Sequence, residues 1–261
     1  PHVLVLLPPS EGKTAATSGD PLDLGALSHP VLNPAREQVL DALIRLCTRT
    51  PSKALETLGL SKNQQAEVAA NTELATAPTG PAWQIYTGVL FGTLDLAGLT
   101  KAARRRATGR LLIASSLFGV VRPDDPIPSY RLSGDVNLPK LGRVDSFWRH
   151  HPGAALHEAA GTGLLVDMRS GTYVKFWPIP AQLANQSVTV KIWQAGPNGS
   201  RNAVSHFNKA SKGELARLLA TTTTEPTTRS GLVDLCRDHG WNAELSPDPK
   251  LGHDRLDVTL D

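Results

Sequence analysis

Residues 2–14 read His-Val-Leu-Val-Leu-Leu-Pro-Pro-Ser-Glu-Gly-Lys-Thr. Two prolines end the apolar run, and a polar loop follows them. A continuous apolar run of this length is typical of a strand that is buried on both faces of a sheet. It is too short for a signal-peptide core and lacks a basic leader. We therefore expect a central strand over residues 3–7, with a functional loop after its carboxyl end.

Helical and strand patterns alternate along the rest of the chain. A helix is predicted from residue 34 to residue 47, where apolar residues recur at helical spacing, and no internal repeat is present. The pattern predicts an α/β fold, a mixed sheet with flanking helices, as a single domain over residues 1–261. Further helices are predicted at 83–106, at 145–160 with a break at Pro152, at 201–220 and at 230–239; strands at 110–114, 164–168, 188–193 and 256–260; and an irregular segment at 115–139.

The segment from Leu55 to Leu74 has the pattern of two short helices joined by a turn. Gly59 can end the first helix and Ser61 can cap the second. This predicts a helix-turn-helix unit.

Charge is balanced along the chain. The net charge is +3, with 16 Lys/Arg against 13 Asp/Glu in residues 1–150 and 11 of each in the remainder. The one dense basic run, residues 101–110, is typical of a solvated helix end. A nucleic-acid surface would therefore have to be assembled by folding, because neither half is a basic arm.

The two cysteines, Cys47 and Cys236, lie in amphipathic helical patterns and lack metal-ligand spacing. We expect both to fill the core in a reducing compartment, the cytoplasm, although the sequence does not exclude a disulfide or a redox role. No run approaches the roughly 20 apolar residues that cross a bilayer. No cofactor, metal or membrane partner is predicted.

The first candidate site is the loop Pro8-Pro9-Ser10-Glu11-Gly12-Lys13-Thr14. A hydroxyl at Ser10, an ammonium at Lys13 and a hydroxyl at Thr14, together with backbone N–H groups, can bind an anion. The spacing of a Walker phosphate loop is absent. The alternative interpretation is a structural turn.

The second candidate is Tyr86-Thr87-Gly88, where a Pro/Gly-rich stretch becomes helical. Thr87 can cap the helix while Tyr86 faces a cleft. The alternative is a helix start with a buried tyrosine.

The third candidate is the segment from Ser115 to Leu132, which carries Arg122, Tyr130 and Arg131. Two guanidinium groups on a proline-stiffened loop can clamp an anion, because each offers a rigid fork of donors. The alternative is that the arginines pair with nearby aspartates of the same segment.

The fourth candidate is Asp167-Met168-Arg169-Ser170 at a strand end. Asp167 can act as acid or base, and Ser170 can supply a ligand hydroxyl. The alternative is that Asp167 only caps the next element.

Two further stretches, Phe147-Trp148 and Asp167 to Tyr173, belong with these segments. Taken in order, all of them resemble the pattern of the peroxide stress protein YaaA family. The resemblance implies an α/β fold with a central cationic cleft, a helix-hairpin-helix-like element, DNA binding, and protection against oxidative damage linked to lowered free iron. We place that element at about residues 51–76. The family pattern has Ser-Pro-Ala-Lys-Thr in the first loop; Lys13-Thr14 is retained here, and the added Glu11 argues against a purely phosphate-binding loop.

Two functions follow as hypotheses. The first is a DNA-binding stress protein whose cations contact phosphates without reading sequence. The second is an enzyme acting on a nucleotide, nucleoside or other small anion, with Lys13, Arg122 and Arg131 holding the anion and Asp167 or Tyr86 moving a proton. Both require Lys13 to lie beside the two arginines, and the oligomeric state is not predicted.

Overall fold

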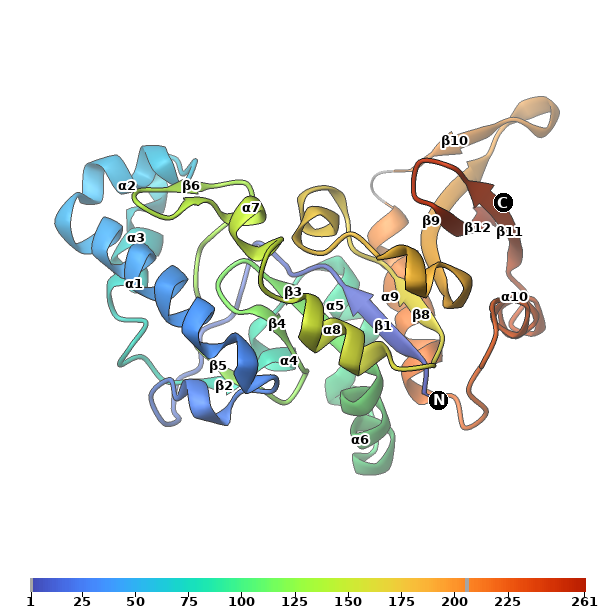
Figure 1. The fold of residues 1–261 in the computed structure, drawn as a ribbon, viewed down its shortest axis with the longest axis horizontal. Helices are drawn as coiled ribbons and strands as arrows, with labels where there is room; N and C mark the ends of the chain where they lie inside the picture. The colour runs from blue at the N-terminus through green and yellow to red at the C-terminus, as the bar shows by residue number, and fades with distance from the viewer. Residues whose placement is uncertain (1, 205–206) are drawn as a thin grey trace.

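Strand β1 (Leu4–Leu7) lies inside a mixed sheet, as its apolar run predicts. The computed structural model describes residues 2–204 and 207–261, and Figure 1 shows their arrangement. Within these residues eight strands form one sheet, in the order β11-β12-β9-β8-β1-β3-β4 with β10 paired to β9. The α/β prediction is confirmed. The other strands are β3 (Leu111–Ser115), β4 (Gly119–Val121), β8 (Leu165–Asp167), β9 (Ser187–Ala195), β10 (Arg201–Ala203), β11 (Asn242–Asp248) and β12 (His253–Leu260).

The centre of the sheet is parallel. β1 pairs in parallel with β3 on one side and with β8 on the other, and β9 and β12 continue the parallel order. The outer strands β4 and β11, and the short β10, are antiparallel to their partners. The carboxyl ends of β1, β3 and β8 therefore meet at one edge of the sheet, where ligand sites of such folds lie.

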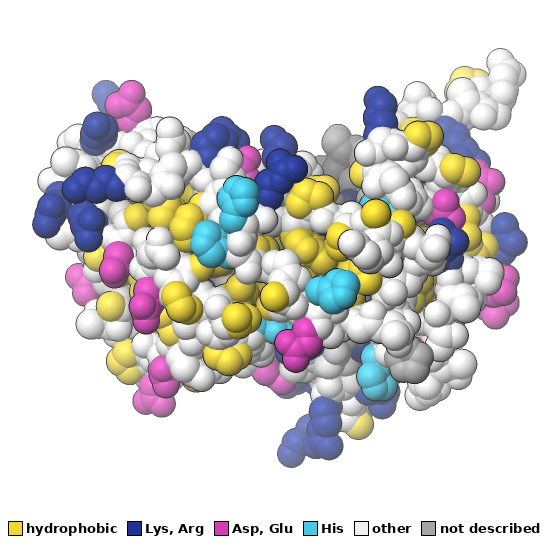
Figure 2. Space-filling model, viewed as in Figure 1, with side chains coloured by type: hydrophobic (Ala, Val, Ile, Leu, Met, Phe, Trp, Pro, Cys, Tyr) yellow, Lys and Arg dark blue, Asp and Glu magenta, His cyan; other side chains and the backbone are white. Residues whose placement is uncertain are grey.

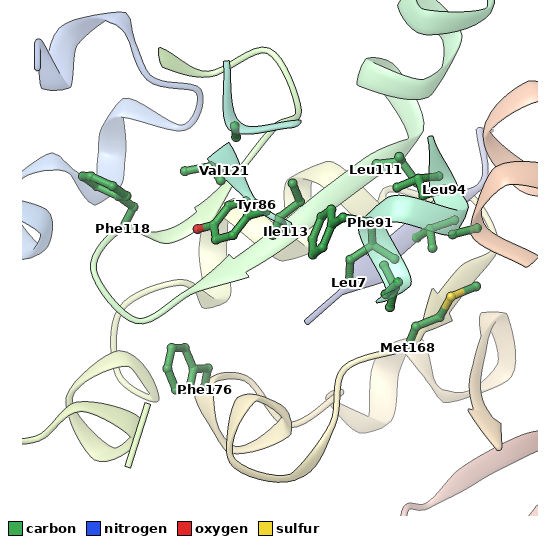
Figure 3. Close-up of a cluster of buried hydrophobic side chains, with 14 of the residues drawn as sticks. Leu7, Tyr86, Phe91, Leu94, Leu111, Ile113, Phe118, Val121, Met168 and Phe176 are labelled. Atoms are coloured by element: carbon green, nitrogen blue, oxygen red, sulfur yellow. The ribbon is translucent and has the colours of Figure 1, made fainter. Parts of the chain in front are cut away.

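Alternate side chains of β1 enter two different cores. Val5 and Leu7 belong to a large apolar cluster with helices α5 (Val89–Leu94) and α9 (Phe207–Thr221). Leu4 and Leu6 belong to a smaller cluster with α8 (Gly153–Ala160). Figure 3 shows part of the large cluster around β1 and β3. Burial on both faces explains why this strand has no polar alternation.

Helices α1 (Asn33–Arg49), α2 (Pro51–Thr57) and α3 (Gln65–Thr72) form a lobe on the left of Figure 1. The turn between α2 and α3 has the predicted chemistry. Gly59 has a φ of +66°, which favours glycine, and Ser61 forms a capping box with Gln64. The predicted ends and cap are confirmed, whereas a helix-hairpin-helix function stays a prediction.

The stretch predicted as one helical region at 83–106 is three helices, so that prediction is wrong in detail. They are α4 (Ala82–Ile85), α5 and α6 (Lys101–Arg110). Gly88, with φ +93°, and Asp95, with φ +44°, separate them. The predicted break at Pro152 is confirmed, because α7 (Val144–Trp148) ends before it and α8 follows it.

Two other predictions were wrong. The segment 115–139 is not wholly irregular, since it contains β4 and the short strands β5 (Pro126–Ile127) and β6 (Asn137–Leu138), which pair with β2 (Gly80–Pro81) and β7 (Gly142–Arg143). The helix expected at 201–220 is helical only in its later part, α9, and it is preceded by β10; residues 205–206 of the expected range lie outside the described residues. Strand β11 was not predicted. Helix α10 (Arg229–Asp238) and β12 lie where the sequence indicates.

Both cysteines are buried free thiols of the large apolar cluster. Burial raises the pKa of the Cys236 thiol to about 12 and also raises the pKa of Cys47. Of the helices in the described residues, none combines the length and the apolar character needed to span a membrane.

Candidate functional site

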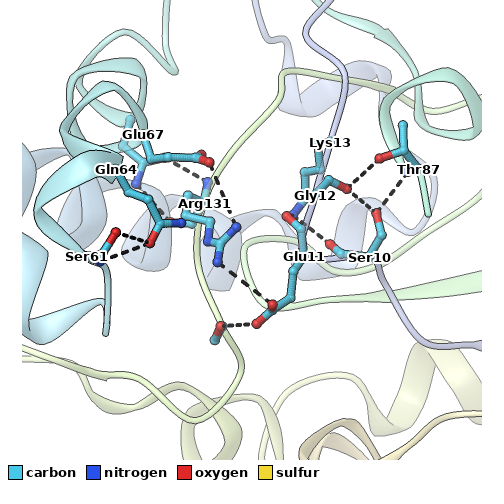
Figure 4. Close-up of polar contacts among 11 residues, drawn as sticks. Ser10, Glu11, Gly12, Lys13, Ser61, Gln64, Glu67, Thr87 and Arg131 are labelled. Carbon is cyan, nitrogen blue, oxygen red and sulfur yellow. Dashed lines mark hydrogen bonds and ion pairs between the residues drawn. The ribbon is translucent and has the colours of Figure 1, made fainter. Parts of the chain in front are cut away.

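The polar loop after β1 is fastened to the segment that begins helix α5. The backbone of Lys13 forms a β-bridge with Tyr86, and the N–H of Thr87 donates to Ser10 Oγ at 3.0 Å. Thr87 Oγ1 donates to the carbonyl of Gly12 at 3.0 Å (Figure 4). The first two candidate segments therefore meet.

Two of the three candidate positions Thr14, Thr87 and Gly88 have other local roles than predicted. Thr87 does not cap α5, because its hydroxyl bonds to the loop and the N-cap residue is Gly88. Gly88, with its positive φ, lines the hollow described below. Thr14 is exposed, and its N–H donates to the Ile85 carbonyl at 2.9 Å, so it extends the loop contact.

The ammonium of Lys13 turns inward from the loop. Nζ donates to the carbonyls of Ser10 at 2.8 Å and Glu11 at 3.1 Å, and it lies 4.3 Å from the ring centroid of Tyr130. Burial, and secondly the charge of Arg131, lower the pKa of Lys13 to about 7 against the opposing effect of the Glu67 and Glu11 carboxylates. A lysine in this setting is partly neutral near pH 7, so it can accept a proton as well as bind an anion.

Arg131 lies between this loop and helix α3. Its backbone N–H donates to Asn71 Oδ1 and its carbonyl accepts from Asn71 Nδ2, both at 2.9 Å. Its guanidinium is 3.9 Å from the carboxylates of Glu11 and of Glu67, too far for hydrogen bonds (Figure 4). Lys13 and Arg131 line the same small hollow, as predicted for this pair.

Tyr86 is buried rather than facing a cleft, so the expected proton-transfer role is corrected in favour of the alternative. Only 2% of its surface is exposed. Its hydroxyl lies 2.7 Å from that of Tyr130, which lies 2.8 Å from Ser115 Oγ, and its ring stacks on Phe91. Burial raises the pKa of both tyrosines above the ordinary value. The hydroxyl chain fixes the loop that carries Arg131.

The prediction that Arg122 joins the anion clamp was wrong. Its guanidinium donates to the carbonyls of Thr108 at 2.9 Å and Gly109 at 3.1 Å, just before β3 begins. Because β4 runs antiparallel to β3, the chain has returned to the opposite edge of the sheet when it reaches Arg122. There its N–H also donates to Asp125, so this residue orders a turn.

Asp167 is also not placed as a free acid or base. Its two carboxylate oxygens accept from Arg169 Nε at 2.9 Å and from Arg169 Nη2 at 2.8 Å, and the Arg169 N–H donates to Oδ1 at 3.0 Å. The side chains are only 1% and 3% exposed. The alternative interpretation, a carboxylate that caps the turn after β8, describes this geometry, whereas Ser170 is exposed at the site.

A hollow of about 430 Å³ lies beside these loops, at the carboxyl ends of β1 and β8. Ser10, Gly88 and Ser170 were predicted for such a site, whereas Lys209 and Lys212 of α9 were not. Their only signal in the sequence is a pair of lysines three residues apart in a helix, which usually marks a solvated face. The lining consists of Pro8, Pro9, Ser10, Glu11, Gly12, Thr87, Gly88, Val89, Leu90, Phe91, Ser170, Tyr173, Asn208, Lys209 and Lys212.

Over the described part of the chain, no group of three or more His, Cys, Asp or Glu side chains is arranged to hold a metal ion. The donors around the hollow are ammonium, hydroxyl and amide groups, with Glu11 as the carboxylate. This donor set suits an anion better than a metal ion.

Comparison with known proteins gives one consistent result. The family model described as "Peroxide stress protein YaaA" matches residues 3–244. A UPF0246 protein of Streptomyces coelicolor is 48% identical over 259 residues, 99% of this chain and 98% of that protein. A UPF0246 protein of Corynebacterium efficiens is 43% identical, over 94% and 96% of the two chains. An uncharacterized protein of Campylobacter jejuni is 27% identical, over 83% and 84%.

Proposed function

The chain belongs to the peroxide stress protein YaaA family, and we propose that it acts in this stress response by binding DNA without reading its sequence. The proposal places it in the cytoplasm, where its two free thiols stay reduced. One observation carries it: the guanidinium of Arg131 makes no hydrogen bond among the described residues, although it is only 18% exposed.

Such a guanidinium is a poised phosphate ligand. It offers five N–H donors in a fork that matches two phosphate oxygens. The carboxylates of Glu11 and Glu67, at 3.9 Å, balance part of its charge without occupying the donors. A phosphate that approaches it gains the hydrogen bonds that these carboxylates do not make.

The position of Arg131 suits an extended polyanion. Asn71 of α3 holds its backbone, so the unit formed by α2, its turn and α3 is joined directly to the site. Lys and Arg side chains also occur along the upper edge of the molecule in Figure 2, over the α1–α3 lobe and near α7. We propose that the α2–α3 unit acts as a helix-hairpin-helix-like element, and that the cations of this edge contact successive phosphates in one cationic cleft.

The test is the salt dependence of binding to a labelled duplex, measured by fluorescence anisotropy for two unrelated sequences. Affinity should fall steeply between about 50 and 200 mM salt, and Arg131→Ala should reduce the slope by about one. Arg105→Ala is the matched control, because Arg105 is exposed on α6, which lies away from the α1–α3 lobe in Figure 1. An affinity that does not change with salt, or a normal slope for Arg131→Ala, would exclude this model.

The volume of the hollow favours a second candidate, an enzyme that acts on a small anionic metabolite. A hollow of about 430 Å³ lies within the range of roughly 300–1,000 Å³ that small-molecule sites occupy. Lys13 lines the small hollow that adjoins this one and shares Ser10 and Glu11 with it. Lys13 is then the group that moves a proton, because Asp167 is paired with Arg169 and Tyr86 is buried. Turnover of a phosphorylated or nucleoside substrate by the wild type and not by Lys13→Met would support it; equal turnover by both would reject this role.

A further inference from the structure

The hollow lies where the strand order of the sheet reverses. After β1, the chain next enters the sheet at β3 on one side of β1, and it later returns to β8 on the other side. In open α/β sheets, ligands bind in the crevice outside the carboxyl ends of the strands at this switch point. The segments that follow β1 and β8 both line the hollow.

Lys212 enters this crevice from α9. Gly213 lets α9 approach closely, because a Cβ there would lie 2.6 Å from the carbonyl oxygen of Leu90 in α5. Lys212 is only 7% exposed, and its Nζ donates to the Met168 carbonyl at 3.3 Å. An ammonium has three donors, and no second hydrogen bond of this one occurs within the described residues. Its remaining donors are available to a ligand.

The charges around Lys212 leave it without a counterion of its own. Asp167, the carboxylate that raises the pKa of Lys212, is bound by Arg169. Burial, which lowers that pKa, is the larger effect. Glu11 and Lys209 are the other charged groups of the lining, and they have opposite signs. A buried cation whose neighbouring carboxylate is already paired with another cation favours an anionic ligand.

The rest of the lining has two characters. The hydroxyl of Ser170 offers a donor that suits a phosphate oxygen, whereas the hydroxyls of Ser10 and Thr87 already donate to the Gly12 carbonyl. Pro8, Pro9, Val89, Leu90 and Phe91 provide an apolar wall for the body of a ligand. Moreover, the side-chain oxygen of Asn208 has no hydrogen-bond partner among the described residues, although it is buried. A sugar hydroxyl would satisfy it.

We propose that this hollow binds a phosphate monoester with a ring-shaped body, of the nucleoside 5′-monophosphate class, and that Lys212 pairs with its phosphate. The inference uses the hollow of the second candidate function and requires neither DNA binding nor turnover. It also assigns the site to α9, whose lysines do not line the small hollow of Lys13 and Arg131.

The test is calorimetric titration of the full chain with inorganic phosphate, ribose 5-phosphate and adenosine 5′-monophosphate. The nucleotide should bind most tightly. Lys212→Met should weaken it roughly 10- to 100-fold, the effect of losing one charge-assisted hydrogen bond. Lys101→Met, at an exposed lysine of α6, is the matched control and should leave affinity unchanged.

A second measurement needs no variant. Because burial lowers the pKa of Lys212, affinity of the wild type should fall as pH rises from about 7.5 to about 10, where the charge of the phosphate itself is constant. Exposed lysines titrate mainly above this range. The proposal is overturned if the wild type binds none of the three probes, if Lys212→Met binds the nucleotide as the wild type does, or if the affinity is independent of pH. Failure of DNA binding would leave all three results unaffected.

Discussion

Replacing Asp167 by Asn should destabilise the fold strongly. The change keeps the size of the side chain but removes the charge that faces Arg169, in a pair whose side chains are 1% and 3% exposed. Arg169 would keep its bonds to the carbonyls of Tyr173 and Trp177, yet its charge would be buried without a partner. Breaking a buried pair in this way costs about 3–5 kcal/mol. An acid-base role alone would predict lost activity at normal stability.

The free energy of unfolding can be measured by urea denaturation, followed by tryptophan fluorescence. Glu244→Gln is the matched control, since it makes the same chemical change in the exposed pair with Arg201 and should cost less than about 1 kcal/mol. The double variant Asp167→Asn/Arg169→Met should recover part of the loss, because it removes the unpaired charge. A loss below about 1 kcal/mol for Asp167→Asn would refute the reasoning.

Three further predictions concern stability. The free energy of unfolding should rise with pH between about 7 and 10.5, because native Lys13 has lost a proton there that the unfolded chain keeps. In urea titrations, the slope of this free energy against pH should exceed that of Lys13→Met by up to about 1.4 kcal/mol per pH unit. Equal slopes would contradict the lowered pKa of Lys13. Gly119→Ala should lower the stability measured by thermal unfolding by about 2–4 kcal/mol, because φ is +75° and a Cβ would lie 2.8 Å from the Trp148 ring. Gly59→Ala, at φ +66° with open space around the Cβ, should cost less. Equal losses of stability would exclude the steric contribution of Trp148. Tyr130→Phe should cost about 1–3 kcal/mol in urea denaturation, since two buried hydroxyls lose their partner; an unchanged midpoint would show that they find others.

The parts of the fold that local chemistry determines were predicted correctly. The apolar run of β1, the turn at Gly59 with the cap at Ser61, and the break at Pro152 each depend on neighbouring residues alone. Strands β4 and β11 were missed for a physical reason. β4 has three residues, and β11 contains Pro247 and alternates poorly, so both are strands because β3 and β12 pair with them.

The candidate site was predictable to the same extent. Ser10 and Lys13 follow β1, so the rule that ligand sites lie beyond the carboxyl ends of parallel strands was enough to place them at this edge. Arg131 lies past the reversal into β4, so its position beside Lys13 does not follow from that rule. Arg122 was misplaced because the rule holds only until the chain reverses, and the reversal into β4 has no clear signal in the sequence. Lys212 was missed because a helical lysine is normally solvated, and only the packing of α9 on α5 buries it.

Half-buried Lys13 and buried Lys212 differ in what an anion can gain from them. Lys13 already donates to two carbonyls, at 2.8 and 3.1 Å, and its ammonium lies over the ring of Tyr130. Lys212 donates to one carbonyl, at 3.3 Å. Since each ammonium has three donors, an arriving phosphate satisfies more unmet hydrogen bonds at Lys212 than at Lys13. Lys212 is therefore the better anchor for a bound anion, whereas Lys13, with its pKa of about 7, is better suited to exchange a proton in the adjoining small hollow that it lines.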